Sequence, residues 1–372
     1  MHVLSIEMRD FRSYARAEAR LGAGLTIVHG PNGAGKSNLI EALYFGCTGR
    51  SPRTRNEREL VRFGEHAARV VIRLADGADE HELSVGYGSP SAGAQAVKRM
   101  TADGAAVERL LDVPERPLVS VFMPERLELV KGAPALRRAH FDQLVAAIWP
   151  LRAQVRRDYA DVLAQRNALL GRIRARAASQ ASLSAWDHEL ARLALALRGH
   201  RAETVELLTE PFAHSTRQLG CSGQLELEYR PRSRAVDEAA YVAELHERLD
   251  VDVQRGFSGH GPHRDELALL CDGRELRVYG SQGEQRLALL ALLLAERALL
   301  ARERGRTPLM LLDDVMSELD FERRQMLASE LASAGQSVIA TTDLAHVPGA
   351  ADASVTRLRI STGAILQEAI AA

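Results

Sequence analysis

The chain has 372 residues, of which 46% are hydrophobic and 26% charged, with 48 basic and 49 acidic side chains and a net charge of −1. This composition is typical of a soluble globular protein with one large domain or two ordinary ones, and it excludes a chain that is basic throughout. Any nucleic-acid-binding surface must therefore be local. No apolar run approaches the ~20 residues that a membrane span needs. The amino terminus has no basic region followed by an apolar stretch, so we expect a cytoplasmic protein with no membrane partner.

The amino-terminal part is predicted to be rich in β-strands. Residues 3–8 alternate weakly, and residues 25–28 form a short apolar strand that runs into a glycine-rich loop. A helix is expected over residues 38–45. The polar, turn-rich region of residues 76–103 favours hairpins over a buried helix.

The glycine-rich loop has the pattern GxxxxGK[ST], with a strand before it and a helix after it, which is the context that a phosphate-binding loop requires. In such a loop the glycines let the backbone approach the phosphates, and the helix N-terminus adds positive potential. Lys36 would reach the β- and γ-phosphates, and Ser37 would bind Mg²⁺. The candidate ATP-binding residues are Gly30, Pro31, Asn32, Gly33, Ala34, Gly35, Lys36 and Ser37.

The middle of the chain predicts two long helices. Spacings of four and three alternate along Val155, Tyr159, Val162, Arg166, Leu169 and Ile173, and again along Trp186, Leu190, Leu193 and Leu197. A short linker at residues 177–182 separates the two series. Matching seams joined by a short connection predict an antiparallel helical hairpin. We expect Arg166 to pack its stem in the seam while its charge reaches water.

The carboxyl-terminal part is predicted to return to a mixed α/β fold. A helix over residues 285–302 is apolar almost all round and should be buried. The apolar strand 309–312 ends in Asp313 and Asp314, which places two carboxylates at the carboxyl edge of a sheet. Alone, this pattern would indicate a strand followed by an acidic turn. With the glycine loop present, we expect Asp313 to hold Mg²⁺ through water and Asp314 to orient or deprotonate the attacking water.

Two further segments look like motifs of ABC-type ATPases. Residues 279–285 (YGSQGEQ) precede the long helix and resemble the ABC signature, and residues 317–320 (SELD) resemble the loop that communicates between two ATP sites. Taken alone, Ser281 could be an ordinary helix N-cap. The resemblance implies that Ser281, Gln282, Gly283 and Glu284 bind the γ-phosphate of ATP held by another subunit.

The long separation between the glycine loop and the paired carboxylates, filled by a helical hairpin, resembles the split head of SMC-like ATPases. Within them, residues 124–142, 261–265 and 311–327 are similar to segments of the RecF family. The expected fold is therefore an α/β ABC-type ATPase head, a P-loop NTPase, with an inserted α-helical hairpin arm. We expect head parts at residues 1–130 and 251–372, with the arm at 131–250.

The resemblance also implies a function. It implies Mg²⁺–ATP as cofactor, a homodimer formed with ATP, and binding to double-stranded and gapped DNA. It further implies slow, DNA-stimulated hydrolysis and help in loading RecA together with RecR during recombinational repair and replication restart. Residues 341–343 (TTD) stand where ABC proteins commonly carry a switch histidine, with His346 shortly after. Neither this sensor nor a Q-loop residue is assigned by the sequence, and Asp314 replaces the glutamate usual in transporters, which favours slow hydrolysis.

Local arginine clusters are the candidates for contacts to DNA. The first lies on the expected arm (Arg152, Arg156, Arg157 and Arg174), and a second lies in residues 50–62. Arginines neutralise phosphates without reading sequence, but a solvated helix face explains each cluster equally well. The rival function is a structural SMC-type chromosome ATPase. About 40 residues of helix reach only about 60 Å, and no hinge domain interrupts them, which favours the RecF-like function.

The cysteines Cys47, Cys221 and Cys271 are far apart in sequence and form no CxxC pair. They indicate neither a zinc site nor a disulfide framework, and we expect buried free thiols.

Overall fold

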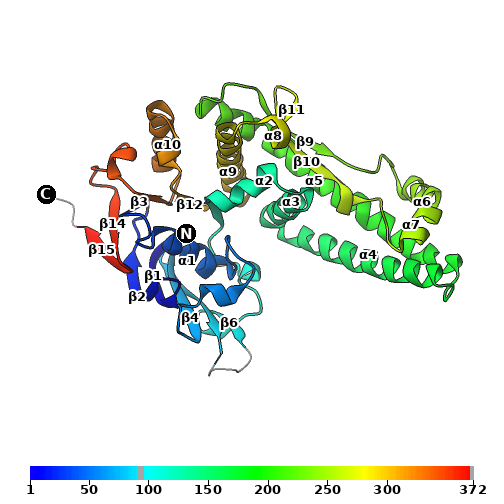
Figure 1. Ribbon diagram of the computed structural model, residues 1–372, viewed down its shortest axis with the longest axis horizontal. Helices are drawn as coiled ribbons and strands as arrows, with labels where there is room; N and C mark the ends of the chain where they lie inside the picture. The colour runs from blue at the N-terminus through cyan, green and yellow to red at the C-terminus, as the bar shows by residue number, and fades with distance from the viewer. Residues whose placement is uncertain (90–95, 369–372) are drawn as a thin grey trace. The chain divides into compact units, whose positions relative to one another are not determined.

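The computed structural model describes residues 1–89 and 96–368 (Figure 1). The chain divides into two compact units. The first contains residues 1–126, 218–220 and 300–372, and the second contains residues 127–217 and 221–299.

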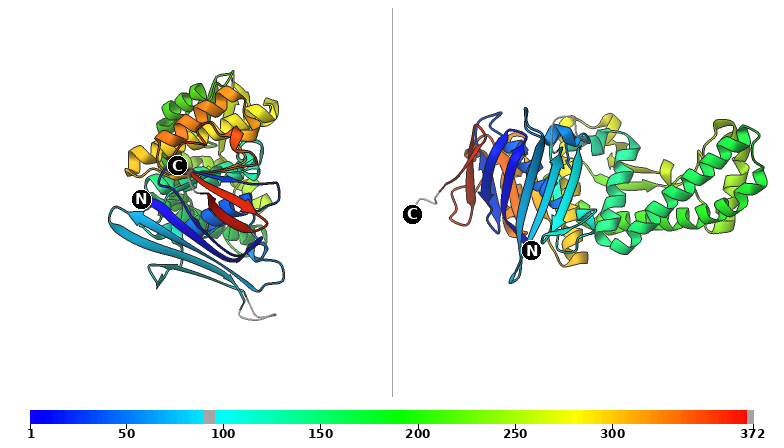
Figure 2. Two further views of the ribbon diagram at one scale, coloured as in Figure 1. Left: turned by 90° about the vertical axis from the view of Figure 1, so that its left-hand side faces the viewer. Right: turned by 90° about the horizontal axis from the view of Figure 1, so that it is seen from below.

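An antiparallel sheet forms one layer of the first unit. Its order is β2-β1-β4-β5-β6-β7, and Figure 2 shows its longer strands, blue to cyan, side by side. Side chains alternate between a buried and an exposed face along the long strands, as a half-buried sheet requires. The turn-rich region therefore forms hairpins as predicted, although residues 90–95 lie outside the described part of the chain. The strands are β1 (His2–Phe11), β2 (Tyr14–Arg20), β4 (Ala67–Asp76), β5 (Asp79–Gly88), β6 (Val97–Ala102) and β7 (Ala105–Ala106).

A second, mainly parallel sheet forms another layer, in the order β15-β14-β3-β13-β12-β8. Its central strands are buried along their whole length, as parallel strands covered on both faces are. Helix α1 (Lys36–Thr48) contacts β4 and β5 of the antiparallel sheet and β12 and β13 of the parallel one. The strands of this sheet are β3 (Leu25–His29), β8 (Val119–Phe122), β12 (Leu309–Asp313), β13 (Ser337–Thr341), β14 (Thr356–Ser361) and β15 (Ala364–Glu368). Helix α10 (Phe321–Ser333) connects β12 to β13.

The second unit is mainly helical, with a small sheet in the order β11-β10-β9. Tyr159 and Val162 share a core cluster with Leu190 and Leu193, while Ile173 packs near the linker, so the two long helices run antiparallel as predicted. The elements are α2 (Glu128–Lys131), α3 (Pro134–Ile148), α4 (Ala153–Arg174), α5 (Ser184–Gln218), β9 (Leu225–Arg230), α6 (Glu238–Glu247), α7 (Leu249–Arg255), β10 (Glu266–Cys271), β11 (Arg274–Glu275), α8 (Leu276–Tyr279) and α9 (Gln282–Arg304). The last residues of α5 and of α9 belong to the first unit.

Arg166 differs from its prediction. Its side chain is completely buried, so the expectation that its charge reaches water is wrong. Its Nε donates to Asp187 at 2.7 Å, and its Nη1 donates to Asp252 at 3.1 Å and to the Ser258 hydroxyl at 2.6 Å. Two buried carboxylates on neighbouring helices replace water as the partners of the guanidinium.

The cysteines are free, as expected, but only Cys47 is buried, and Cys221 and Cys271 are partly exposed. Among the described residues, every helix is too short or too polar to cross a membrane.

Candidate nucleotide-binding site

The glycine loop connects β3 to α1 at the carboxyl edge of the parallel sheet. Gly30, Gly33 and Gly35 all have positive φ, a conformation that a side chain disfavours. A Cβ on Gly30 would lie 2.3 Å from the Ile360 carbonyl oxygen, so this glycine is also required sterically. Gly35 caps α1 without any side-chain hydrogen bond. The first N–H groups of α1 therefore keep the arrangement that binds anions.

Lys36 begins α1 and folds back over the loop. Its Nζ donates to the carbonyl oxygens of Gly30 at 2.8 Å and Pro31 at 3.0 Å. Burial lowers the pKa of Lys36, and the nearby carboxylates of Asp314 and Asp313 oppose that shift. The ammonium group is thus held beside the loop by two neutral acceptors that a phosphate could replace.

Asp313 ends β12, two strands away from the strand that leads into the loop. Its side chain is buried, and burial raises its pKa above the ordinary value, while a hydrogen bond from Ser37 opposes the shift. The hydroxyl of Ser37 and the carboxylate of Asp313 therefore lie together. Two hard oxygen ligands of this kind fit Mg²⁺.

Asp314 follows directly and has a left-handed backbone, with φ of 51°. Its N–H donates to the Ala340 carbonyl at the end of β13, and its own carbonyl accepts from Ser317. One side-chain oxygen, Oδ1, is buried with no hydrogen-bond partner among the described residues. A buried acceptor without a partner is costly, and a bound water would satisfy it.

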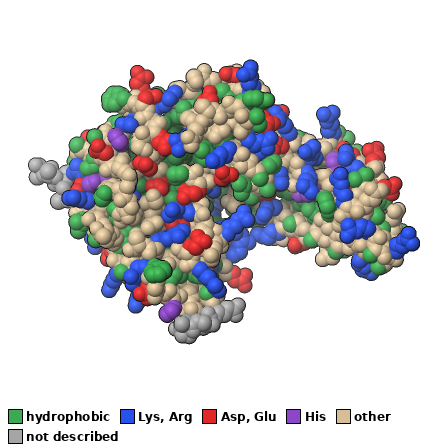
Figure 3. Space-filling model, viewed as in Figure 1, with side chains coloured by type: hydrophobic (Ala, Val, Ile, Leu, Met, Phe, Trp, Pro, Cys, Tyr) green, Lys and Arg blue, Asp and Glu red, His purple; other side chains and the backbone are tan. Residues whose placement is uncertain are grey.

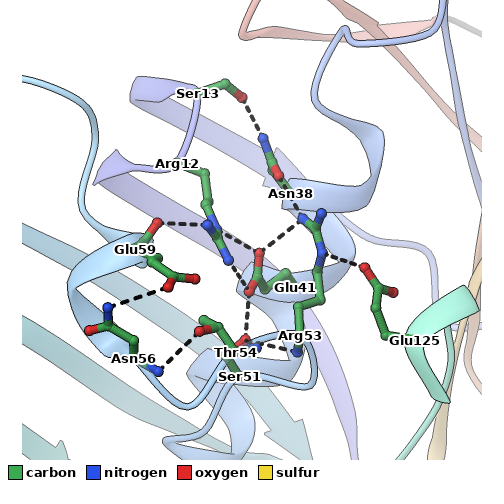
Figure 4. Close-up of polar contacts among 10 residues, drawn as sticks. All are labelled: Arg12, Ser13, Asn38, Glu41, Ser51, Arg53, Thr54, Asn56, Glu59 and Glu125. Carbon is green, nitrogen blue, oxygen red and sulfur yellow. Dashed lines mark hydrogen bonds and ion pairs between the residues drawn. The ribbon is translucent and has the colours of Figure 1, made fainter. Parts of the chain in front are cut away.

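A cluster of hydrogen bonds and ion pairs surrounds Glu41 in α1, the helix that follows the glycine loop (Figure 4). Glu41 lies in α1, is completely buried, and accepts both Nε and Nη2 of Arg12 at 2.8 Å. It also accepts the Ser51 hydroxyl at 2.6 Å and Nη1 of Arg53 at 3.3 Å. Arg12 has a positive φ of 52°, and the paired contacts to Glu41 hold that strained conformation.

Arg12 and Glu41 were not predicted from the sequence, and Arg53 was predicted only as part of a basic cluster. Arg53 also donates to Glu125 at 3.1 Å and to Asn38 at 3.2 Å. The available signal was a glutamate within an otherwise apolar stretch of α1, because a buried carboxylate needs a cationic partner.

The signature segment lies in the second unit, at the start of α9. The Ser281 hydroxyl accepts the N–H of Glu284 at 3.2 Å, and Glu284 accepts the N–H of Ser281 at 2.7 Å. These reciprocal bonds form a capping box. Ser281, Gln282 and Gly283 are exposed, so the N-terminus of a long helix reaches the surface at this point.

The predicted arm arginines already have partners within the second unit. Arg152 stacks on Trp149 and pairs with Glu203, and Arg156 lies 3.3 Å from Asp142. Arg157 donates to the side-chain oxygen of Gln154, and Arg174 donates to the backbone carbonyl of Arg255. On the face shown in Figure 3, basic and acidic side chains are interspersed.

The segment around residues 137–142 and the segment 261–265 meet in the core of the second unit. Arg137 is buried and donates to Glu266 at 2.9 Å, and Arg138 donates to the carbonyl oxygen of Asp265. Arg201 pairs with Asp142 at 2.8 Å and lies 3.4 Å from Asp265. These two motifs therefore build the second unit's core.

Comparison with known proteins agrees with this geometry. A family model described as an AAA domain matches residues 5–102. The protein from Heliobacterium modesticaldum described as "DNA replication and repair protein RecF" is 37% identical over 365 residues, 93% of each chain. The protein of the same description from Streptomyces avermitilis is 36% identical and covers 98% of this chain and 99% of its own. This chain belongs to the RecF family.

Solved structures extend the comparison to the fold. A structure of the recombination mediator RecF with ATP, described within the RecFOR pathway, matches with a TM-score of 0.85 at 27% identity, covering 99% of this chain and 98% of that one. An SMC head bound to a domain of ScpA matches with a TM-score of 0.60 at 15% identity, covering 100% of this chain and 98% of that one, which supports the fold alone. The predicted ABC-type head with an inserted helical arm is confirmed.

Proposed function

We propose that this RecF-family chain is an ATP-dependent DNA-binding protein of recombinational repair and replication restart. In this proposal it binds Mg²⁺–ATP, dimerises with ATP on gapped or double-stranded DNA, and helps to load RecA together with RecR. The observation that carries the proposal is the meeting of Lys36, Ser37, Asp313 and Asp314 at one edge of the parallel sheet. The ATP-bound relative supports the choice of nucleotide.

The residues divide the work of phosphoryl transfer between them. Lys36 and the N–H groups of α1 would bind the phosphates, while Ser37 and Asp313 would hold the Mg²⁺ that neutralises developing charge. Asp314 would orient the attacking water through its unpartnered Oδ1. An exposed signature segment at a helix N-terminus supports a role for Ser281, Gln282, Gly283 and Glu284 on the partner's ATP.

The SMC-type alternative is not favoured by the arm. Helix α4 has 22 residues and α5 has 35. At 1.5 Å per residue the longer one spans only about 50 Å, far too little for the long arms of a chromosome organiser.

The trans-acting signature is the part of the proposal that one experiment tests most directly. Ser281→Asp keeps an N-cap acceptor but places a negative charge where the γ-phosphate would meet the helix, whereas Ser281→Thr keeps both the cap and the neutral hydroxyl. We expect the Asp variant to bind ATP as a monomer, yet to lose ATP-dependent dimerisation and hydrolysis. The Thr variant should retain both.

Equilibrium sedimentation with and without ATP, beside an ATPase assay, measures these outcomes. Mixing Ser281→Asp with Lys36→Ala creates one site in which an intact lysine faces an intact serine, and partial activity is expected to return. Normal dimerisation and hydrolysis by Ser281→Asp alone would show that the signature does not act in trans.

A further inference from the structure

The exposed face of the antiparallel sheet carries a row of arginines that no sequence motif indicates. Cross-strand pairing aligns Arg16 of β2 with Arg9 of β1, Arg9 with Arg69 of β4, Arg69 with Gly86 of β5, and Gly86 with Arg99 of β6. Four of five neighbouring strands thus contribute an arginine to one row of cross-strand neighbours that runs across the sheet. With strands about 4.8 Å apart, the row is about 19 Å long.

All four arginines are exposed. The Arg16 side chain is 83% accessible and lies 3.9 Å from Glu7, and Arg9 is 78% accessible and lies 3.8 Å from Asp10. Arg69 donates to the Ser84 hydroxyl, and no hydrogen bond or ion pair of the Arg99 side chain is present within the described residues. Exposed ion pairs of this length contribute almost nothing to stability, so the positive charge of the row remains available.

The fold gains little from this arrangement beyond the hydrogen bond of Arg69 and the two long ion pairs. Like charges directly opposite each other on neighbouring strands destabilise a sheet. The next level of the same face carries Glu18 and Glu7, so the sheet could have alternated charges within each row. A costly row of like charges on an exposed face indicates a ligand of opposite charge.

Gly86 gives a second, independent indication. A Cβ at this position would meet nothing closer than a carbonyl oxygen at 3.8 Å, and its φ is not positive. Glycine is thus not required by the fold, and within a strand it costs about 0.5–1 kcal/mol relative to alanine. Its effect is to leave the middle of the row, between Arg69 and Arg99, without a side chain, so that a ligand can approach the backbone closely.

We propose that this row, Arg9, Arg16, Arg69 and Arg99, binds the phosphate backbone of duplex DNA. Guanidinium groups pair with phosphates in a planar fork, and a regular row of them suits the regular charges of a nucleic-acid strand better than the irregular surface of an acidic protein. A length of about 19 Å corresponds to five or six base-pair steps of about 3.4 Å. The proposal rests on the proposed DNA-binding function, but it assigns the contact to the sheet of the first unit and not to the arm arginines of the second.

The test measures affinity for a gapped duplex at several salt concentrations, with the full chain and ATP. In Arg9→Gln/Arg69→Gln/Arg99→Gln, the slope of log K against log[salt] should fall by about 0.9 for each phosphate that is no longer neutralised, hence by about 2.7. The matched control is Arg192→Gln/Arg230→Gln/Arg277→Gln, which removes the same charge from exposed or partly exposed arginines that already pair with glutamates. Its slope should stay close to that of the parent protein.

Gly86→Glu sharpens the test, because the side chain fits on the exposed face but places a carboxylate in the row. It should weaken DNA binding at low salt, and Gly86→Ala should weaken it less. A parent-like slope in the triple arginine variant would overturn the proposal while leaving DNA binding itself intact. Loss of binding to a protein of the pathway, with DNA binding unchanged, would also overturn it, in favour of an acidic protein ligand. If the parent protein bound no DNA, the proposed function would fail first.

Discussion

The glycine-loop region of the first unit and the core of the second unit both bury charged side chains, but they satisfy them differently. In the second unit, Arg166 and Arg201 are almost completely inaccessible and their carboxylate partners are buried with them. Around the loop, Lys36 is held by carbonyl oxygens of its own loop, and Asp314 keeps a buried oxygen without a partner among the described residues. Nη2 of Arg166 and one oxygen of Asp187 also lack a hydrogen-bond partner among the described residues, but these two side chains neutralise each other's charge. Charges that are paired internally specify a fold, whereas a charge held by neutral groups, as on Lys36, is available to a ligand.

The largest effect that separates the two regions should come from breaking the buried network. Asp187→Ala leaves the guanidinium of Arg166 with one of its two carboxylates, and we expect a loss of about 3–5 kcal/mol in the free energy of unfolding. Glu189→Ala, which removes an exposed i,i+3 partner of Arg192, should cost less than about 1 kcal/mol. Denaturant unfolding measures both. Equal losses would mean that burial does not distinguish the pairs.

Lys36→Ala should have the opposite effect, with a large loss of ATP affinity and a small loss of stability. Removing the ammonium group deletes charge-assisted hydrogen bonds to the phosphates, worth about 3 kcal/mol, so ATP affinity should fall about 100-fold. The free energy of unfolding should change much less than in Asp187→Ala, because the present partners of the lysine are uncharged carbonyl oxygens and its removal strands no buried charge. Calorimetric titration with ATP, beside an unfolding curve, gives both values. An unchanged ATP affinity would remove Lys36 from the site.

Asp314→Asn tests the unpartnered carboxylate. Asparagine tolerates the left-handed backbone at this position, so the fold should be kept. ATP binding should persist, while hydrolysis should fall by about 100-fold, the range seen when one transition-state interaction is removed. Single-turnover hydrolysis measures the effect, and turnover at the parent rate would place the water-orienting role elsewhere.

The smallest effect concerns pH. The pKa of Asp313 is raised by burial, and only the ionised carboxylate can hold Mg²⁺, so affinity for Mg²⁺ should fall about tenfold per pH unit below that pKa. The loss should begin at a higher pH than the ordinary carboxyl value of 3.8 predicts. Asp313→Asn should abolish this dependence, as measured by Mg²⁺ titration at fixed ATP.

The same shift has a consequence for stability without Mg²⁺. The native state binds this proton more tightly than the unfolded state does, so the contribution of Asp313 to stability falls as pH rises through the raised pKa. Asp313→Asn should therefore stabilise the metal-free protein at neutral pH. A destabilised variant would mean that the negative charge itself supports the fold.

The sequence alone determined the features whose chemistry is local. A glycine loop between a strand and a helix, a strand ending in two carboxylates, and two apolar seams each need only neighbouring residues. The strand and helix around the loop, the strand that ends at Asp313, and the helical hairpin were therefore predicted from the sequence, whereas the roles of Lys36, Ser37 and Asp313 stay predictions. The signature segment was proposed from family resemblance, which was possible because the segment is a continuous run of residues.

Only the tertiary structure decided which charges are buried, paired or aligned. Arg166 read as a surface arginine because its partners Asp187 and Asp252 lie far along the chain, on other helices. Glu41 gathers Arg12 and Arg53 across a long stretch of sequence, and the row formed by Arg9, Arg16, Arg69 and Arg99 exists only through strand register. The sequence says which side chains carry charge. Whether such a charge is available to a ligand depends on its dielectric surroundings and on the nearest opposite charge, and both are set by the fold.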